Sequence, residues 1–252
     1  MKLALLSDIH SNIQAFDACV ADARARGATQ FAFIGDYVGY GANPGEVVDR
    51  IMAMVNDGAV AIIGNHDAIA CNPPAAPSDV LGEMTAAWTY DQLSAEQRKF
   101  LIECPRTHVD GNVLLVHATA DAPERWHYVR DERSAADRLN AAVKISDEIR
   151  YVFGGHVHRQ TLYYQGQGRG LMAFAPTAGA AIPVSAHRRW IATIGSVGQP
   201  RDGRTDAMYA LFDREKAQLT FARVPYDYGS AADAIRAAGL PEFFADRLLR
   251  GQ

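Results

Sequence analysis

Short apolar runs recur along residues 1–158, and each of them ends at a small polar cluster. These runs are LALLSDIH at 3–10, FAFIGD at 31–36, AVAIIGNH at 59–66, VLLVHA at 113–118 and YVFGGH at 151–156. Continuous runs rich in Val, Ile, Leu and Phe are typical of strands that are buried on both faces, as in parallel sheets. The pattern therefore predicts five buried strands that end in polar loops.

The segments between the first three runs have helical spacing. One apolar stripe comprises Ile13, Phe16, Val20 and Ala23, and the other comprises Val47, Val48, Ile51 and Val55. Ser11 or Asn12 can begin the first helix, and Asn43 followed by Pro44 can begin the second. Strand and helix thus alternate over the first 60 residues, which predicts a parallel sheet with crossover helices.

Residues 68–109 interrupt this alternation. The proline-rich stretch NPPAAPSD at 72–79 predicts a loop, and two helix-like pieces follow at 80–90 and 94–103. Ser94 and Gln97 have the spacing of a capping box at the start of the second piece. We predict one domain over residues 1–252, with 68–109 inserted as a helical cap beside the polar ends of the strands. A purely structural helical pair is the alternative interpretation.

The C-terminal part favours strands over helices. TLYYQGQ, GLMAFAP, RWIATIG, AMYALFD and QLTFARV are strand-like, and DREK at 213–216 predicts a hairpin turn. They predict a second, more antiparallel sheet, and two closing helices are predicted at 231–238 and 242–249. The expected fold class is α/β, a four-layer α/β/β/α sandwich of two mixed sheets flanked by helices.

Composition limits the function classes. The chain has 252 residues, 48% of them hydrophobic, and a net charge of −4 without a run of Lys or Arg, so it is not expected to bind nucleic acid in bulk. Cys19, Cys71 and Cys104 have no C-x-x-C spacing, which argues against a disulfide framework. No signal peptide or membrane span is apparent, so we expect no membrane association and a cytoplasmic location. The sequence leaves the oligomeric state open.

The polar clusters contain the residue types that bind divalent metals. They are Asp8, His10, Asp36, Asn65, His66, His117, His156 and His158. Each short motif is common by itself, but ligands in α/β sheets gather outside the carboxyl ends of the strands. Carboxylate, amide and imidazole donors at one such place predict a divalent metal site.

These motifs resemble those of the calcineurin-like metallophosphoesterases. The blocks D-x-H, G-D, G-N-H-[DE], a single His after a strand and G-H-x-H occur in that order, and the resemblance covers most of the chain. DIHSN, GDYVGYG and GSVGQPRDG resemble a bacterial branch often described as relatives of diadenosine tetraphosphatases or protein phosphatases.

The resemblance implies the same sandwich fold and two divalent metal ions. One ion would be held by Asp8, His10, Asp36 and His158, and the other by Asp36, Asn65, His117 and His156, with Asp36 shared. Mn, Fe, Zn, Co and Ni all accept such donors. Two dications, two carboxylates and a bridging hydroxide leave about one positive charge, which favours attack of that hydroxide on a phosphoryl group.

Further residues are candidates for catalysis and substrate binding. By resemblance, His66 is the expected proton donor to the leaving group, and Asp67 is a candidate to orient it. Asn12 and Arg159 are candidates for substrate binding, with a helix cap as the alternative for Asn12 and a solvated surface position for Arg159. Other arginines that could contact phosphate, which the sequence does not rank, are Arg125, Arg201 and Arg204.

The remaining histidines and four aromatic residues lie outside the motifs. His108, His127 and His187 fall outside the blocks and are expected to be surface residues. Core packing and nucleobase stacking are both open for four aromatic residues, Trp88, Tyr90, Trp126 and Tyr128.

The second block departs from the protein-phosphatase pattern G-D-x-x-D-R-G. Gly39 replaces the Asp that supports the catalytic His in that branch, and Tyr40 replaces the Arg that binds phosphate. A monoester dianion benefits most from a bidentate cation, so the loss favours phosphodiester or phosphoanhydride hydrolysis. We expect a small phosphate ester, with nucleotides among the candidates. The alternatives are a phosphomonoesterase or serine/threonine protein phosphatase, and a metal-binding scaffold or sensor without turnover.

Overall fold

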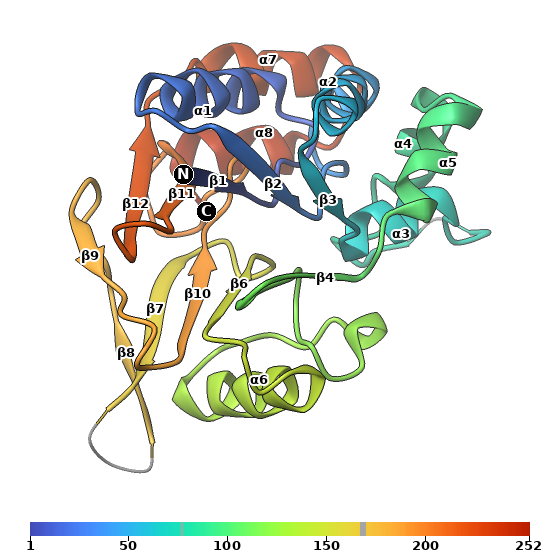
Figure 1. The fold of residues 1–252 in the computed structure, drawn as a ribbon. Coiled ribbons are helices and arrows are strands. Elements are labelled where there is room, and N and C mark those ends of the chain that lie inside the picture. Colours follow the sequence, from blue (N-terminus) through green and yellow to red (C-terminus); the bar gives the residue numbers. More distant parts are fainter. Residues whose placement is uncertain (77, 167–169) are drawn as a thin grey trace.

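The computed structural model describes residues 1–76, 78–166 and 170–252. Two six-stranded sheets face one another, with helices on both outer sides (Figure 1). The first sheet has the order β3-β2-β1-β11-β12-β9, and the second has the order β4-β5-β6-β10-β7-β8. The predicted four-layer α/β/β/α sandwich is therefore confirmed.

The first sheet consists of β1 (Lys2–Leu6), β2 (Gln30–Ile34), β3 (Val60–Ile62), β9 (Ala181–Pro183), β11 (Ala207–Asp213) and β12 (Gln218–Val224). The second consists of β4 (Thr107–Asp110), β5 (Val113–Val116), β6 (Tyr151–Gly154), β7 (Gln160–Gln165), β8 (Leu171–Phe174) and β10 (Trp190–Ile194). Strands β1, β2 and β3 are mutually parallel, as are β5, β6 and β10, while the other pairings are antiparallel.

Helices cover the outer faces of the sheets. The first sheet carries α1 (Ile13–Ala25), α2 (Pro44–Asn56), α7 (Tyr228–Ala237) and α8 (Glu242–Arg250), and the second carries α6 (Glu132–Ile145). At one side lie α3 (Asn65–Cys71), α4 (Ala86–Gln92) and α5 (Ala95–Glu103) (Figure 1). A short 3-10 helix spans Pro123–Arg125. No helix in the described part of the chain is long and apolar enough to cross a membrane.

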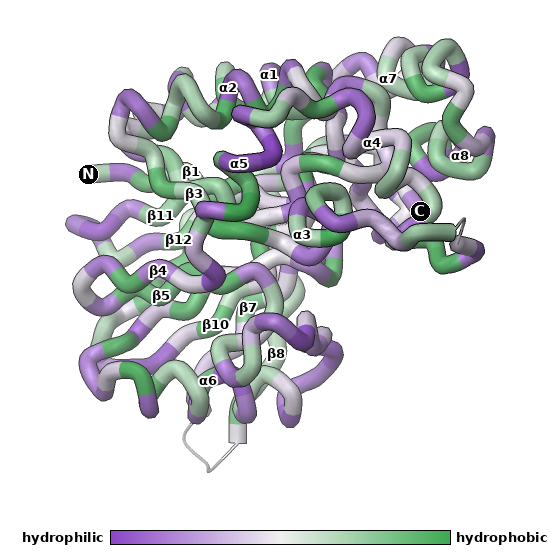
Figure 2. The backbone as a smooth tube through the Cα atoms, turned by 90° about the vertical axis from the view of Figure 1, so that its right-hand side faces the viewer, coloured by the Kyte–Doolittle hydropathy of each residue, from purple (hydrophilic) through white to green (hydrophobic). Residues whose placement is uncertain are grey.

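Apolar side chains fill the space between the layers. Leu5, Ile34 and Phe153 belong to a buried cluster formed by both sheets, and Phe16 and Val48 belong to a second cluster beneath α1 and α2. Figure 2 shows hydrophobic segments along the stacked strands and hydrophilic ones at turns and outer edges. Burial of these faces fixes the two sheets against each other, so that the strand ends meet at one edge.

Two sequence predictions need correction, and one helix was missed. Strands β11 and β12 belong to the first sheet and not to the second, because β11 pairs antiparallel with β1, with Lys2 opposite Asp213. The sequence pattern of a strand does not specify which other strand it pairs with. In the 80–90 piece, only Ala86–Gln92 forms a helix, preceded by turns. The helix α6 was not predicted, although Asp131 and Ser134 form a capping box at its start.

The other local predictions agree well with the structure. The Ser94 and Gln97 capping box begins α5, and α7 and α8 close the chain. The strand predicted from TLYYQGQ ends at Gln165, and its last residue, at position 167, lies outside the described residues, as does position 77 in the proline-rich loop.

Candidate metal centre

The polar clusters converge where strands of both sheets end. Asp8 and His10 follow β1, Asp36 follows β2, and Asn65 begins α3 directly after β3. From the second sheet, His117 follows β5, and the pair His156 and His158 follows β6.

Five of these seven residues have a left-handed backbone. Their φ angles are 54° at Asp8, 50° at His10, 57° at Asp36, 71° at His156 and 55° at His158. This conformation costs about 1–3 kcal/mol at a residue other than glycine, and such strain concentrates at functional sites. The fold therefore keeps an unfavourable backbone in order to aim these side chains inward.

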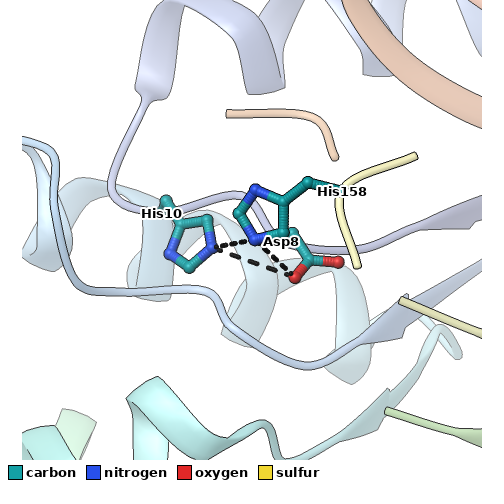
Figure 3. A group of neighbouring side chains, drawn as sticks. All are labelled: Asp8, His10 and His158. Atoms are coloured by element: carbon teal, nitrogen blue, oxygen red, sulfur yellow. Dashed lines mark hydrogen bonds and ion pairs between the residues drawn. The ribbon is translucent and has the colours of Figure 1, made fainter. Parts of the chain in front are cut away.

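Asp8, His10 and His158 form one compact group (Figure 3). Asp8 Oδ1 and His158 Nε2 are 3.1 Å apart, and His10 Nε2 lies 3.1 Å from His158 Nε2. All three side chains are buried. One carboxylate oxygen and two imidazole nitrogens thus face a common point.

Asp36 connects this group to a second one, which contains His117 and His156. Its Oδ2 lies 3.2 Å from His117 Nε2 and 3.9 Å from His10 Nε2. Asn65 Oδ1 is 3.2 Å from the same His117 nitrogen. The carboxylate of Asp36 therefore lies between the two groups, where it could be shared by two cations.

Four imidazole rings are each fixed by a hydrogen bond to a backbone carbonyl. The bonds are His10 Nδ1 to Val38 at 3.1 Å, His117 Nδ1 to Ile34 at 2.7 Å, His158 Nδ1 to Gln199 at 2.6 Å and His156 Nε2 to Trp126 at 2.9 Å. A carbonyl only accepts, so these nitrogens carry the proton and the opposite nitrogen is free to bind a metal. The donor set therefore fits divalent cations.

The electrostatics of the pocket agree with this assignment. Burial raises the pKa of Asp8, but His158 outweighs it and holds that pKa below its usual range; at Asp36, His117 overcomes burial in the same way. Burial lowers the pKa of His10 and His158, and lowers that of His156 to about 3. At neutral pH the pocket thus presents two carboxylates and unprotonated imidazoles, which together attract a cation.

His117 is the exception. Burial alone would lower its pKa, but the adjacent Asp36 outweighs burial and raises it to about 9. Its Nε2 faces the acceptor oxygens of Asp36 and Asn65, so this nitrogen carries a proton unless a metal ion replaces it.

His66 is buried beside the cluster, and one of its ring nitrogens lies within 4.8 Å of donor atoms of His10 and Asp36. Its ring centroid is 4.4 Å from that of Tyr40 and 4.9 Å from that of His10. A Cβ atom placed on Gly39 would lie only 2.6 Å from its Nδ1, and one on Gly82 would lie 3.6 Å from its Cε1. The His66 ring forms no hydrogen bond within the described residues, and burial lowers its pKa to about 4.

Within the described residues Asp67 forms its side-chain hydrogen bonds with backbone N–H groups and none with the His66 ring, so the orienting role stays a hypothesis. Asp67 Oδ2 accepts from the backbone N–H groups of Asp36 and Gly64, and its Oδ1 accepts from those of Tyr37 and Val38, at 2.8–3.2 Å. The carboxylate is fully buried. It therefore holds the loop after β2 in the shape that presents Asp36.

For Asn12 and Arg159 the structure agrees with the alternative interpretations, a helix cap and a surface position. Asn12 is the N-cap of α1: its Oδ1 accepts from Ala15 N at 3.1 Å, and its Nδ2 donates to the Gly198 carbonyl at 2.9 Å. Arg159 is exposed and donates to the carbonyl of Arg201. The arginine nearer the cluster is Arg201, whose guanidinium carbon lies 5.8 Å from the centre of the Tyr40 ring.

Two of the four aromatic candidates lie at the centre. Tyr128 stacks on His156 with ring centroids 4.0 Å apart and is 44% exposed. The rings of Trp126 and His117 are inclined at 74°, with centroids 5.9 Å apart. Trp88 instead packs against the α7 and α8 cluster, and Tyr90 packs against Arg98. The other histidines, His108, His127 and His187, belong to none of the metal-type groups found within the described ranges.

The 80–85 turns reach the centre from the inserted segment. Thr85 Oγ1 accepts from Tyr40 N at 3.0 Å, and Gly82 approaches the His66 ring. The segment thus borders both His66 and Tyr40. Its designation as a cap over 68–109 stays a prediction.

Comparison with known proteins agrees with this geometry. Residues 1–217 match the model of the calcineurin-like phosphoesterase superfamily domain. An uncharacterized protein of Methanocaldococcus jannaschii is 31% identical over 255 residues, which cover 99% of this chain and 98% of the relative.

Two solved structures share the whole fold. A metallophosphoesterase from Sphaerobacter thermophilus is 30% identical, with a TM-score of 0.87 and full coverage of both chains. A hypothetical protein from Pyrococcus horikoshii is 20% identical, with a TM-score of 0.78, and the match covers 100% of this chain and 98% of that one. At this lower identity the likeness concerns the fold alone.

Proposed function

Because this chain belongs to the calcineurin-like phosphoesterase superfamily, we propose that it hydrolyses phosphodiester or phosphoanhydride bonds in a small substrate with the help of two divalent metal ions. Asp8, His10, Asp36 and His158 would hold one ion, and Asp36, Asn65, His117 and His156 the other. When bound, such ions polarise phosphoryl oxygens and lower the pKa of water. A nucleotide is among the substrates that this chemistry would accept.

The arrangement of the imidazoles carries the proposal. The carbonyls of Val38 and Gln199 fix the tautomers of His10 and His158, so two unprotonated nitrogens face each other at 3.1 Å beside Asp8. Lone pairs held this close repel one another unless a cation lies between them. A site that served only to stabilise the fold would have no reason to hold them so.

His66 is the proposed proton donor to the leaving oxygen. Its ring edge is free of hydrogen bonds in the part of the chain that the structure describes, and it lies next to Asn65 at the start of α3. Its low pKa of about 4 leaves it neutral in the free protein, so donation requires the negative charge of a bound phosphate to raise that pKa. His66 would then matter most for substrates with poor leaving groups.

The surroundings of Gly39 and Tyr40 support the preference for esters of lower charge. Gly39 adjoins the His66 ring but has no carboxylate that could support it. Tyr40 places a phenol ring beside His66, where the protein-phosphatase pattern has an arginine. Tyr40 itself offers a phosphomonoester dianion no bidentate cation.

The test is turnover of bis-para-nitrophenyl phosphate and para-nitrophenyl phosphate with added Mn. We expect higher kcat/KM for the diester, and loss of turnover in Asp36→Asn. His66→Ala should lose about 10²–10⁴-fold on an alkyl diester and much less on nitrophenyl esters. Absence of metal-dependent turnover with both esters would refute the enzyme proposal, and a large excess of monoester turnover would refute the diester preference.

A further inference from the structure

Two arginines, Arg201 and Arg247, converge on one neutral side chain next to the metal centre. Arg201 donates to Gln199 Oε1 from Nε and Nη2, at 3.2 and 2.8 Å, and Arg247 on α8 donates to the same oxygen from Nη1 at 3.4 Å. Among the described residues neither arginine forms an ion pair with a carboxylate.

The acidic residues next to these arginines in the sequence are engaged elsewhere. Asp202 pairs with Arg223, and Asp246 pairs with Arg250 at 3.3 Å. Both guanidinium groups are half-buried. Burial lowers the pKa of Arg247, and repulsion by Arg201 lowers it further. Two like charges are therefore held together around a single amide oxygen, which is unfavourable without an anion.

The arginine pair is tied to the metal-type ligands. The backbone carbonyl of Gln199 accepts from His158 Nδ1 at 2.6 Å, while its side chain holds both arginines. Tyr40 lies between Arg201 and the centre, with its ring 4.6 Å from that of His10. The positive charge of Arg201 also contributes to the low pKa values of His66 and His158.

We propose that Arg201 and Arg247 bind a second phosphate group of the substrate, next to the one that the metal centre would bind. A simple diester has no second phosphate, so the substrate class becomes molecules with a diphosphate unit, such as nucleoside polyphosphates. This inference rests on the proposed function, since it assigns the neighbouring phosphate of the same substrate. Arg247 is contributed by the last helix, outside all of the metal-type motifs.

Binding of inorganic pyrophosphate and inorganic phosphate to the Mn-loaded protein, measured by calorimetry, tests the inference without turnover. We expect wild type to bind pyrophosphate at least tenfold more tightly than phosphate. Arg247→Gln and Arg201→Gln should weaken pyrophosphate binding by about tenfold or more and phosphate binding much less. Chelation of Mn by pyrophosphate is the same for every variant at a fixed metal concentration, so it cancels in the comparison.

Gln199→Glu provides a second route to the same result. It keeps the side-chain size and the backbone carbonyl that holds His158, but it supplies an internal anion to the arginines, so it should also weaken pyrophosphate binding selectively. Arg250→Gln, three residues further along α8, is the matched control and should bind like wild type. Equal weakening of both anions, or unchanged pyrophosphate binding in the arginine variants, would overturn the inference, even if diester turnover confirmed the enzyme.

Discussion

The Nε2 atoms of His10 and His158 lie 3.1 Å apart, although the Nδ1 atom of each ring already donates to a backbone carbonyl. Neither Nε2 atom then carries a proton in the neutral ring, and burial lowers the pKa of both residues, so protonation does not relieve the contact at neutral pH. A cation held by both nitrogens would remove this repulsion. Metal binding and stability should therefore be linked.

The first prediction is a metal-dependent melting temperature. At free Mn about 100 times its Kd, the stabilisation is about 2.7 kcal/mol, which corresponds to a rise of about 5–10 °C for a chain of this size. Scanning fluorimetry with Mn and with a chelator measures the shift. His158→Asn should remove most of it, and the exposed His187→Asn should keep it. A melting temperature that does not respond to metal would contradict the prediction.

The second prediction concerns His117, whose pKa of about 9 means that it carries a proton at pH 7 before metal binds. This proton must leave when Nε2 becomes a ligand, so metal affinity should rise with pH up to about 9 and level off above it. Calorimetry in two buffers of different ionisation enthalpy counts the protons released.

Water on the metal can release protons as well, so a variant is needed to identify the one from His117. His117→Asn keeps a polar ligand that does not titrate, and it should release about one proton fewer than wild type at pH 7. Equal proton release by the two proteins would show that His117 is already neutral in the free protein.

The strand ends were predictable, because a buried strand followed by Asp or His has a clear pattern in the sequence. Asp8, His10, Asp36 and His117 were all placed correctly at such ends. The carbonyls that fix the imidazoles were not predictable, since every residue has a carbonyl and only the folded chain decides which ones face a ring. The same holds for Asp67, whose partners are backbone N–H groups.

Contacts between residues far apart in the sequence were the other feature that could not be predicted. Arg201 lies in the recognised GSVGQPRDG block. Its convergence with Arg247 depends on how α8 packs against α7 and Tyr40, which no spacing along the chain reveals. Asn12 had two interpretations, and the helix cap proved to be the one that the structure shows.

The third prediction concerns Asp67→Asn. An amide has one acceptor oxygen, so it cannot accept from all the backbone N–H groups that the carboxylate serves, and the loop that presents Asp36 should loosen. We expect a lower melting temperature and metal affinity reduced by about 10–100-fold. At saturating metal the pH profile of turnover should keep its shape, because the hydrogen bonds of the Asp67 carboxylate in the described part of the chain go to backbone N–H groups and not to the His66 ring. A profile shifted in Asp67→Asn but unchanged in the exposed Asp91→Asn would support an orienting role for Asp67.

The fourth prediction separates backbone strain from contact with His66. Gly39 has φ of 86°, and a Cβ atom there would lie 2.6 Å from His66 Nδ1, whereas Gly58 has φ of 98° and nothing within 4 Å of its Cβ position. Replacing either glycine by alanine costs about 1–3 kcal/mol for the left-handed backbone. Only Gly39→Ala should also displace the His66 ring. Turnover of an alkyl diester should then fall at least tenfold more in Gly39→Ala than in Gly58→Ala at similar melting temperatures, since the proton donor is moved while the metal-type ligands stay in place. Equal turnover in the two folded variants would mean that the position of the His66 ring does not limit the reaction.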